Sequence, residues 1–215
     1  MENNPKQLFP SDLKEPDFIL LDELKHNDLL PFIRAAYKVR NKSYYFHNLM
    51  NSLFLGCLIF LMVKDVFLYG KWHFSSEFGY FSYGLLGSFL FIPLHEFIHV
   101  LAYKYVGAKE TSYDMNLRKF YFMAMADQFV ANAKQFRVVA LAPFVVISCL
   151  CLISMLFTQG EWIYFPIGLL FTHSLFCSGD FGLLNYFETH KDKDVYTYDD
   201  KAKGESYFYA RVKKA

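Results

Sequence analysis

Four long apolar runs constrain the fold most strongly, at residues 46–68, 83–106, 137–157 and 162–187. Each is near or above the roughly 20 residues that an α-helix needs to cross about 30 Å of hydrocarbon. Hydrophobic residues make up 54% of the 215 residues and aromatic residues 20%, which is high for a soluble domain of this length. A soluble core around four such helices would need a larger chain, so the runs predict four transmembrane helices.

The runs divide the chain into three parts. Residues 1–45 are polar and charged, so we expect a cytoplasmic segment with a surface helix near 17–40 and no cleavable signal peptide. Residues 46–187 would form a four-helix membrane domain, and residues 188–215 a small polar cytoplasmic tail. The predicted fold class is therefore an all-α integral membrane protein.

The distribution of lysine and arginine predicts the orientation of the helices. Seven of these residues precede the first run, two lie at 64–82, six lie at 104–137, none lie at 158–161 and seven lie in the tail. Cytoplasmic loops carry the excess of positive charge. The alternation predicts four crossings of the cytoplasmic membrane, with both termini in the cytoplasm. The formal net charge of +1 gives no indication of a nucleic acid partner.

Two polar segments have the character of extended strands. The loop at 107–136 begins with Gly107, a typical helix stop, and contains YDMNLRKFYFMAMAD at its centre. Its aromatic and methionine residues favour one or two strands at the membrane surface, with a short amphipathic helix as the alternative. The tail sequence VYTYDDKAKGESYFYARV favours two strands around a turn.

The second run contains three ionisable residues, in the stretch FIPLHEFIHVLAYKY at 91–105. His95 and His99 are four positions apart, so on a helix both imidazoles can reach one metal ion. Glu96 lies next to His95 around the helix and can approach a metal-bound water without binding the metal. Ionisable residues are costly in hydrocarbon, so a functional role is the default hypothesis. The pattern predicts a catalytic Zn²⁺ site, with Glu96 as general base and then acid.

A third protein ligand must come from another helix, because catalytic zinc normally has three. The fourth run offers His173 and Asp180, in the stretch THSLFCSGDFG. These two are about 10 Å apart along a continuous helix, so they cannot both bind the same ion. Their depth does not decide between them, but Gly179 and Gly182 favour Asp180 because they permit close approach of another backbone. His173 would then donate a hydrogen bond at the site or be an ordinary buried polar residue.

The motifs LHEFIH at 94–99 and SGDFG at 178–182 together resemble the site-two-protease class of membrane zinc metalloproteases. In particular, they resemble a family of small four-span bacterial proteins described as putative zincin peptidases. The resemblance covers about residues 40–190 and implies a zinc-dependent membrane endopeptidase, with membrane lipid around it and a peptide or membrane protein as substrate. It gives His95, His99 and Asp180 as metal ligands.

The resemblance leaves open which residues stabilise the oxyanion, and His173 and Asn185 are the candidates in this sequence. In the larger class an extended loop near the active site can hold the substrate as an added strand, and the segment 110–130 could do so here.

A non-catalytic function is the alternative. In the larger class the aspartate is followed directly by glycine, whereas here Phe181 separates Asp180 from Gly182. Together with the small size of the chain, this leaves open a membrane scaffold or regulator with a structural or vestigial metal site. A metal transporter would need several intramembrane ligand sets along a path, and the sequence shows one.

Overall fold

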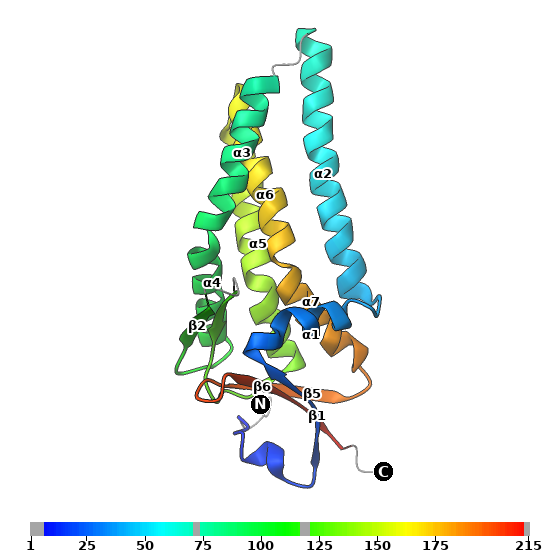
Figure 1. The fold of residues 1–215 in the computed structure, drawn as a ribbon, viewed down its shortest axis with the longest axis vertical. Coiled ribbons are helices and arrows are strands. Elements are labelled where there is room, and N and C mark those ends of the chain that lie inside the picture. Colours follow the sequence, from blue (N-terminus) through cyan, green and yellow to red (C-terminus); the bar gives the residue numbers. More distant parts are fainter. Residues whose placement is uncertain (1–6, 71–73, 117–120, 213–215) are drawn as a thin grey trace, which may run out of the picture.

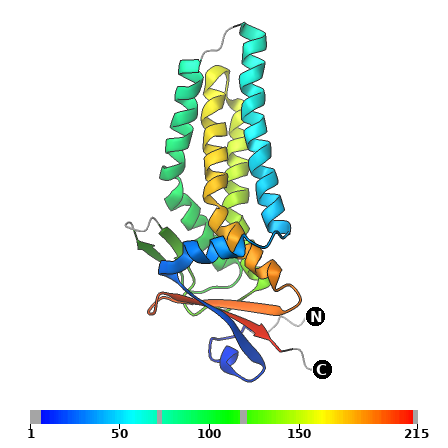
Figure 2. The same ribbon diagram turned by 45° about the vertical axis from the view of Figure 1, so that its right-hand side comes forward.

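The computed structural model describes residues 7–70, 74–116 and 121–212. Its helices form an elongated bundle, and its strands gather at one end of that bundle (Figure 1). The short helix α1 (Leu29–Ala36) lies across this end, between the longer helices and a sheet (Figure 2).

Four helical paths run along the bundle, two of them unbroken. The unbroken helices are α2 (Lys42–Tyr69) and α5 (Ala133–Phe157). The other two paths are bent pairs, namely α3 (Phe74–Leu90) with α4 (Ile92–Tyr105), and α6 (Tyr164–Phe176) with α7 (Ser178–Thr189). The pairs bend by 47° and 42° at their breaks. Among the described residues, two helices are long and apolar enough to cross a membrane, or four if each bent pair is one span.

The predicted all-α fold class is wrong, because a four-stranded antiparallel sheet lies at one end of the bundle. Its order is β1 (Phe18–Lys25), β6 (Glu205–Arg211), β5 (Asp194–Asp200) and β4 (Ala131–Asn132). The two strands expected in the tail are confirmed as β5 and β6. The helix expected near 17–40 is present only as α1, because the residues before it form β1, which pairs with β6 along its length.

The extended loop is confirmed as a separate hairpin of β2 (Ser112–Asn116) and β3 (Tyr121–Met125). The helix that follows it begins at a capping box, in which Asn132 and Gln135 satisfy each other's backbone N–H groups. At the other end of the bundle, α2 stops at Gly70, which has the left-handed φ of 62° that glycine tolerates best.

One apolar cluster joins the sheet to the ends of the helices. It includes Leu24 of β1, Phe136 and Phe144 of α5, Phe181 of α7 and Phe208 of β6, all buried. The cluster therefore packs α5 and α7 against the sheet. This contact holds α7, the part of its helix that follows the break, in place.

Helices α3 and α6 pack through two glycines. A Cβ atom on Gly84 would overlap with the carbonyl oxygen of Phe165, and one on Gly168 would lie 2.5 Å from the carbonyl oxygen of Phe81. Each glycine thus allows one helix to rest on the backbone of the other.

We expect Gly84→Ala to destabilise the protein, whereas Gly79→Ala in the same helix should not. The methyl group at position 84 would overpack the α3–α6 contact, at a cost of about 1–3 kcal/mol or more. At position 79 the added Cβ meets nothing within 4 Å, and alanine is favoured over glycine in a helix by about 1 kcal/mol. Thermal unfolding of the two variants in the same detergent measures the difference. Equal midpoints would contradict this account of the packing.

Candidate metal centre

The two helix breaks lie beside the candidate ligands. Helix α4 starts immediately after the break that separates it from α3. It has a proline in its first turn, where the missing N–H costs no helical hydrogen bond. His95, Glu96 and His99 follow in this helix and are buried. Asp180 lies in the first turn of α7, directly after the second break.

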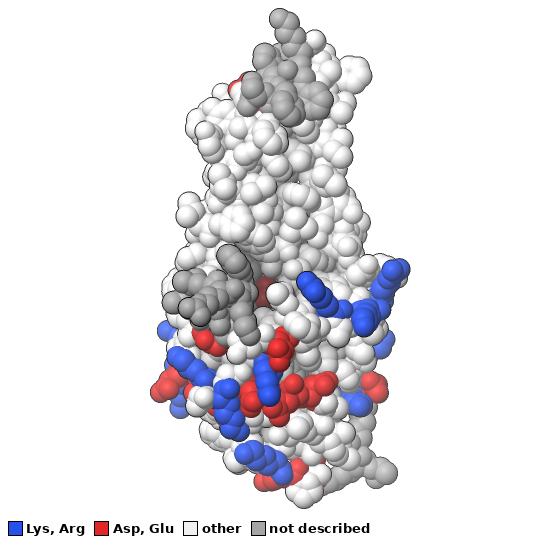
Figure 3. Space-filling model, in the orientation of Figure 1, with Lys and Arg blue, Asp and Glu red and all other residues white. Residues whose placement is uncertain are grey.

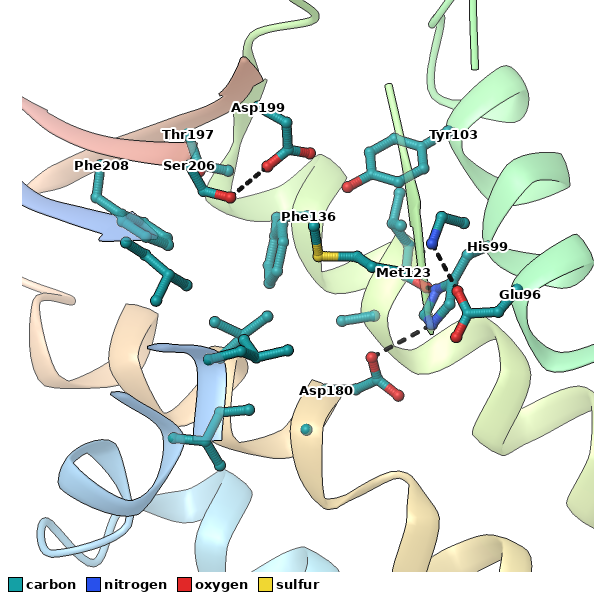
Figure 4. A pocket seen from close by; sticks show the side chains of 18 residues that line it. Glu96, His99, Tyr103, Met123, Phe136, Asp180, Thr197, Asp199, Ser206 and Phe208 are labelled. Carbon is teal, nitrogen blue, oxygen red and sulfur yellow. Dashed lines mark hydrogen bonds and ion pairs between the residues drawn. The ribbon is translucent and has the colours of Figure 1, made fainter. Parts of the chain in front are cut away.

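The structure brings His95, His99 and Asp180 together. The two Nε2 atoms of the histidines are 3.1 Å apart. The carboxylate of Asp180 places Oδ2 3.4 Å from Nε2 of His95 and Oδ1 3.2 Å from Nε2 of His99. Figure 4 shows the carboxylate of Asp180 facing His99, with Glu96 beside it.

These distances fit a zinc ion. Ligand atoms about 2.0–2.1 Å from a tetrahedral zinc lie about 3.3 Å from one another. Two imidazole nitrogens and one carboxylate oxygen form a donor set typical of catalytic zinc, and they leave a fourth position for water. The site could therefore hold zinc through these three residues.

Hydrogen bonds orient the two imidazole rings. Nδ1 of His99 lies 3.0 Å from the backbone oxygen of Val139, which can only accept, so Nδ1 carries the proton and Nε2 is free to bind metal. Nδ1 of His95 lies 3.0 Å from Nε2 of His173. His173 therefore contacts the outer nitrogen of His95, on the side away from Asp180.

A second donor set shares His95. His95, His173 and Cys177 also place potential ligand atoms within 4.8 Å of one another. On one continuous helix, as the sequence predicts, His173 and Asp180 are alternatives for the third ligand. Because that helix is broken at Cys177, both of them reach His95, each on a different side of the ring.

Asn185 lies elsewhere. Its buried side-chain amide donates hydrogen bonds to the backbone oxygens of Ala36 and Val39, at the end of α1. It is not among the residues that line the cavity between Glu96, Asp180 and the sheet, or among those that line the cavity against His95 and Glu96, both described below.

Glu96 is held by the hairpin. Its Oε2 accepts a hydrogen bond of 2.6 Å from the backbone N–H of Ala124 in β3. Ala124 lies opposite Tyr113 of β2 in the hairpin. Because the N–H of Ala124 points toward Glu96 and not toward β2, these two residues form a non-hydrogen-bonded pair. Among the described strands β3 pairs only with β2, so its other edge, which we call the free edge, faces the metal centre. No local sequence signal marks Ala124, because it contributes only its backbone.

A polar network anchors this hairpin to the sheet. His26 follows β1 and is buried, with Nδ1 3.1 Å from Asp114 Oδ2 of β2 and Nε2 3.2 Å from Ser206 Oγ of β6. The Ser206 hydroxyl donates to Asp199 Oδ1 at 2.6 Å. Burial raises the pKa of Asp199, and the hydrogen bond from Ser206 partly opposes this shift. These residues come from distant segments, and no sequence pattern connects them.

A cavity of about 100 Å³ separates the metal centre from the sheet. In Figure 4, Glu96, His99 and Asp180 lie on one side of it, and Asp199, Ser206 and Phe208 lie on the other. A second cavity, of about 350 Å³, lies against His95 and Glu96. Glu96 thus lies between two cavities.

One family model matches part of the chain. A family model described as "Putative zincin peptidase" matches residues 88–194, which include all the candidate ligands and Glu96. No curated protein and no solved structure matches the chain. The match supports this family and indicates a metallopeptidase.

Proposed function

We propose, from the match to this zincin peptidase family and the geometry of its site, that the protein is a zinc-dependent endopeptidase of a membrane. The observation that carries the proposal is the cluster of His95, His99 and Asp180, with Glu96 beside it. The two Nε2 atoms are 3.1 Å apart, and each lies 3.2–3.4 Å from one of the two carboxylate oxygens of Asp180. A site built only to bind metal would not need a buried carboxylate that lies outside the donor set.

The residues of the site have separable tasks. Zinc, when bound, would lower the pKa of a water molecule and polarise the carbonyl of the bond to be cut. Glu96 would take a proton from the attacking water and pass it to the leaving amine. The N–H of Ala124 holds one oxygen of Glu96 in place, and the backbone oxygen of Val139 fixes the proton of His99 on Nδ1. His173 would fix the tautomer of His95 in the same way.

A membrane location is supported by the surface of the bundle. On the face shown in Figure 3, Lys, Arg, Asp and Glu lie mainly at the sheet end, and the bundle above carries almost none. Large apolar side chains are exposed along the helices, including Phe60 (65%), Phe67 (85%) and Leu156 (81%). Such a surface is costly in water and suits lipid. With the excess of Lys and Arg, we propose that the sheet end lies on the cytoplasmic side.

The free edge of β3 is the proposed place for the substrate. Since Ala124 directs its N–H toward the site, Phe122 two residues earlier directs its backbone groups the same way. A peptide or an unfolded segment of a membrane protein could pair with this edge as an added strand.

A non-catalytic regulator or scaffold remains the alternative function. The second donor set, in which His173 and Cys177 join His95, would support a structural metal site that makes no use of Glu96.

Metal removal tests the proposed function. The full chain is reconstituted in liposomes with an unfolded reporter protein, and cleavage is followed by mass spectrometry. We expect cleavage that stops after chelation of zinc and returns when zinc is added back. Cleavage that persists at full rate in metal-free protein would contradict a zinc peptidase, and so would metal-loaded protein that cleaves nothing across a set of unfolded reporters.

A further inference from the structure

We propose that the larger cavity beside His95 and Glu96 binds a large apolar side chain of the substrate, next to the bond that is cut. The inference rests on the proposed function and adds the class of substrate residue. The polar side chains that line this cavity include His95, Glu96 and His173, at its catalytic end. Its apolar lining comprises Phe89, Ile92, Phe122, Leu175 and Phe176.

The cavity exists because two helices break next to one another. Phe89 and Ile92 lie on either side of the break between α3 and α4, and Phe176 ends α6 just before its break. The rings of Phe89 and Phe176 meet edge to face, with centroids 5.0 Å apart. The two rings are 52% and 38% exposed, so this wall also faces outward. Figure 3 shows a hollow on this face of the molecule with Asp or Glu surface at its base.

Strand β3 connects the cavity to the place proposed for the substrate. Phe122 lines the larger cavity, and the next residue, Met123, lines the smaller one. Alternate side chains of a strand point to opposite sides, and a strand paired with β3 would follow the same alternation. Two consecutive substrate residues would therefore face different cavities, one of them the apolar cavity.

The lining sets the chemistry of the occupant. Apart from the three polar groups at the catalytic end and the hydroxyl groups of Ser88 and Ser178, the described residues offer this side chain only apolar partners. An aromatic or large aliphatic side chain would lose water contact there. A carboxylate would lie among these apolar side chains, and the described lining includes no lysine or arginine to pair with it. We therefore expect a preference for phenylalanine, leucine or methionine over alanine, and exclusion of aspartate.

Binding of zinc chelators tests the pocket without relying on turnover. The probes are two peptide hydroxamates that differ only in the side chain next to the hydroxamate, which is benzyl in one and methyl in the other. Their affinities for the zinc-loaded full chain in detergent are measured by titration calorimetry. Leu175→Trp fills the cavity, and Leu150→Trp is the matched control, because Leu150 is similarly exposed (52% against 43%) and does not line it.

We expect the benzyl probe to bind the wild type at least about tenfold more tightly than the methyl probe. Leu175→Trp should remove most of this preference, while Leu150→Trp should keep it and leave both affinities unchanged. Equal affinities in the wild type, or an intact preference in Leu175→Trp, would overturn the pocket alone. A chain that holds no zinc and binds neither probe would overturn the proposed function and the pocket with it.

Discussion

Replacing Glu96 with glutamine is expected to abolish proteolysis while the zinc content of the protein stays unchanged. Glu96 is not one of the three proposed ligands, so its loss should not release the metal. The glutamine oxygen can still accept the hydrogen bond from Ala124, so the local structure should persist. A proton acceptor in this position typically contributes about 10²- to 10⁴-fold to the rate, and we expect a loss of that order.

Glu110→Gln is the matched control, since Glu110 is an exposed glutamate outside the site. Both variants are measured for zinc by elemental analysis and for cleavage of the same reporter in liposomes. The control should match the wild type in both. Full cleavage by Glu96→Gln would exclude Glu96 as the general base, and loss of zinc from it would place Glu96 among the ligands.

Replacing Asp180 with alanine is expected to weaken zinc binding more than replacing His173 with phenylalanine. Asp180→Ala removes one of three donor atoms and leaves two imidazoles. His173→Phe leaves all three donors and removes only the group that contacts Nδ1 of His95. Loss of such an outer contact typically costs about 10- to 100-fold in metal affinity.

Competition with a chromophoric chelator measures both affinities. Asp192→Ala serves as the control, because Asp192 is exposed beyond the end of α7 and lines neither cavity beside Glu96. It should bind zinc like the wild type. The reverse order, with His173→Phe the more damaging change, would favour the donor set of His95, His173 and Cys177.

The features that were predictable from sequence are local ones. The spacing of His95 and His99 places both on one face of a helix wherever that helix lies, and the structure has them in one buried cluster. The alternating aromatic residues of the tail likewise predict β5 and β6 without knowledge of their partners.

The features that were not predictable depend on contacts between distant segments. Strand β1 is extended because it pairs with β6, which is distant in the sequence. The residues of β1 alone do not exclude a helix. The break at Cys177 is not marked by proline, and a continuous helix was the natural expectation. That expectation made His173 and Asp180 exclusive alternatives, whereas the bend lets each contact His95. Ala124 acts through a backbone N–H, which no residue type signals.

X-ray absorption at the zinc edge tests the central claim most directly. The purified full chain is loaded with one equivalent of zinc, and the first shell of the metal is measured. His95, His99 and Asp180 with a water predict a shell of nitrogen and oxygen only, at about 2.0–2.1 Å, with the outer scattering of two imidazoles. A sulfur ligand at about 2.3 Å would identify Cys177 as a ligand and contradict the proposed centre.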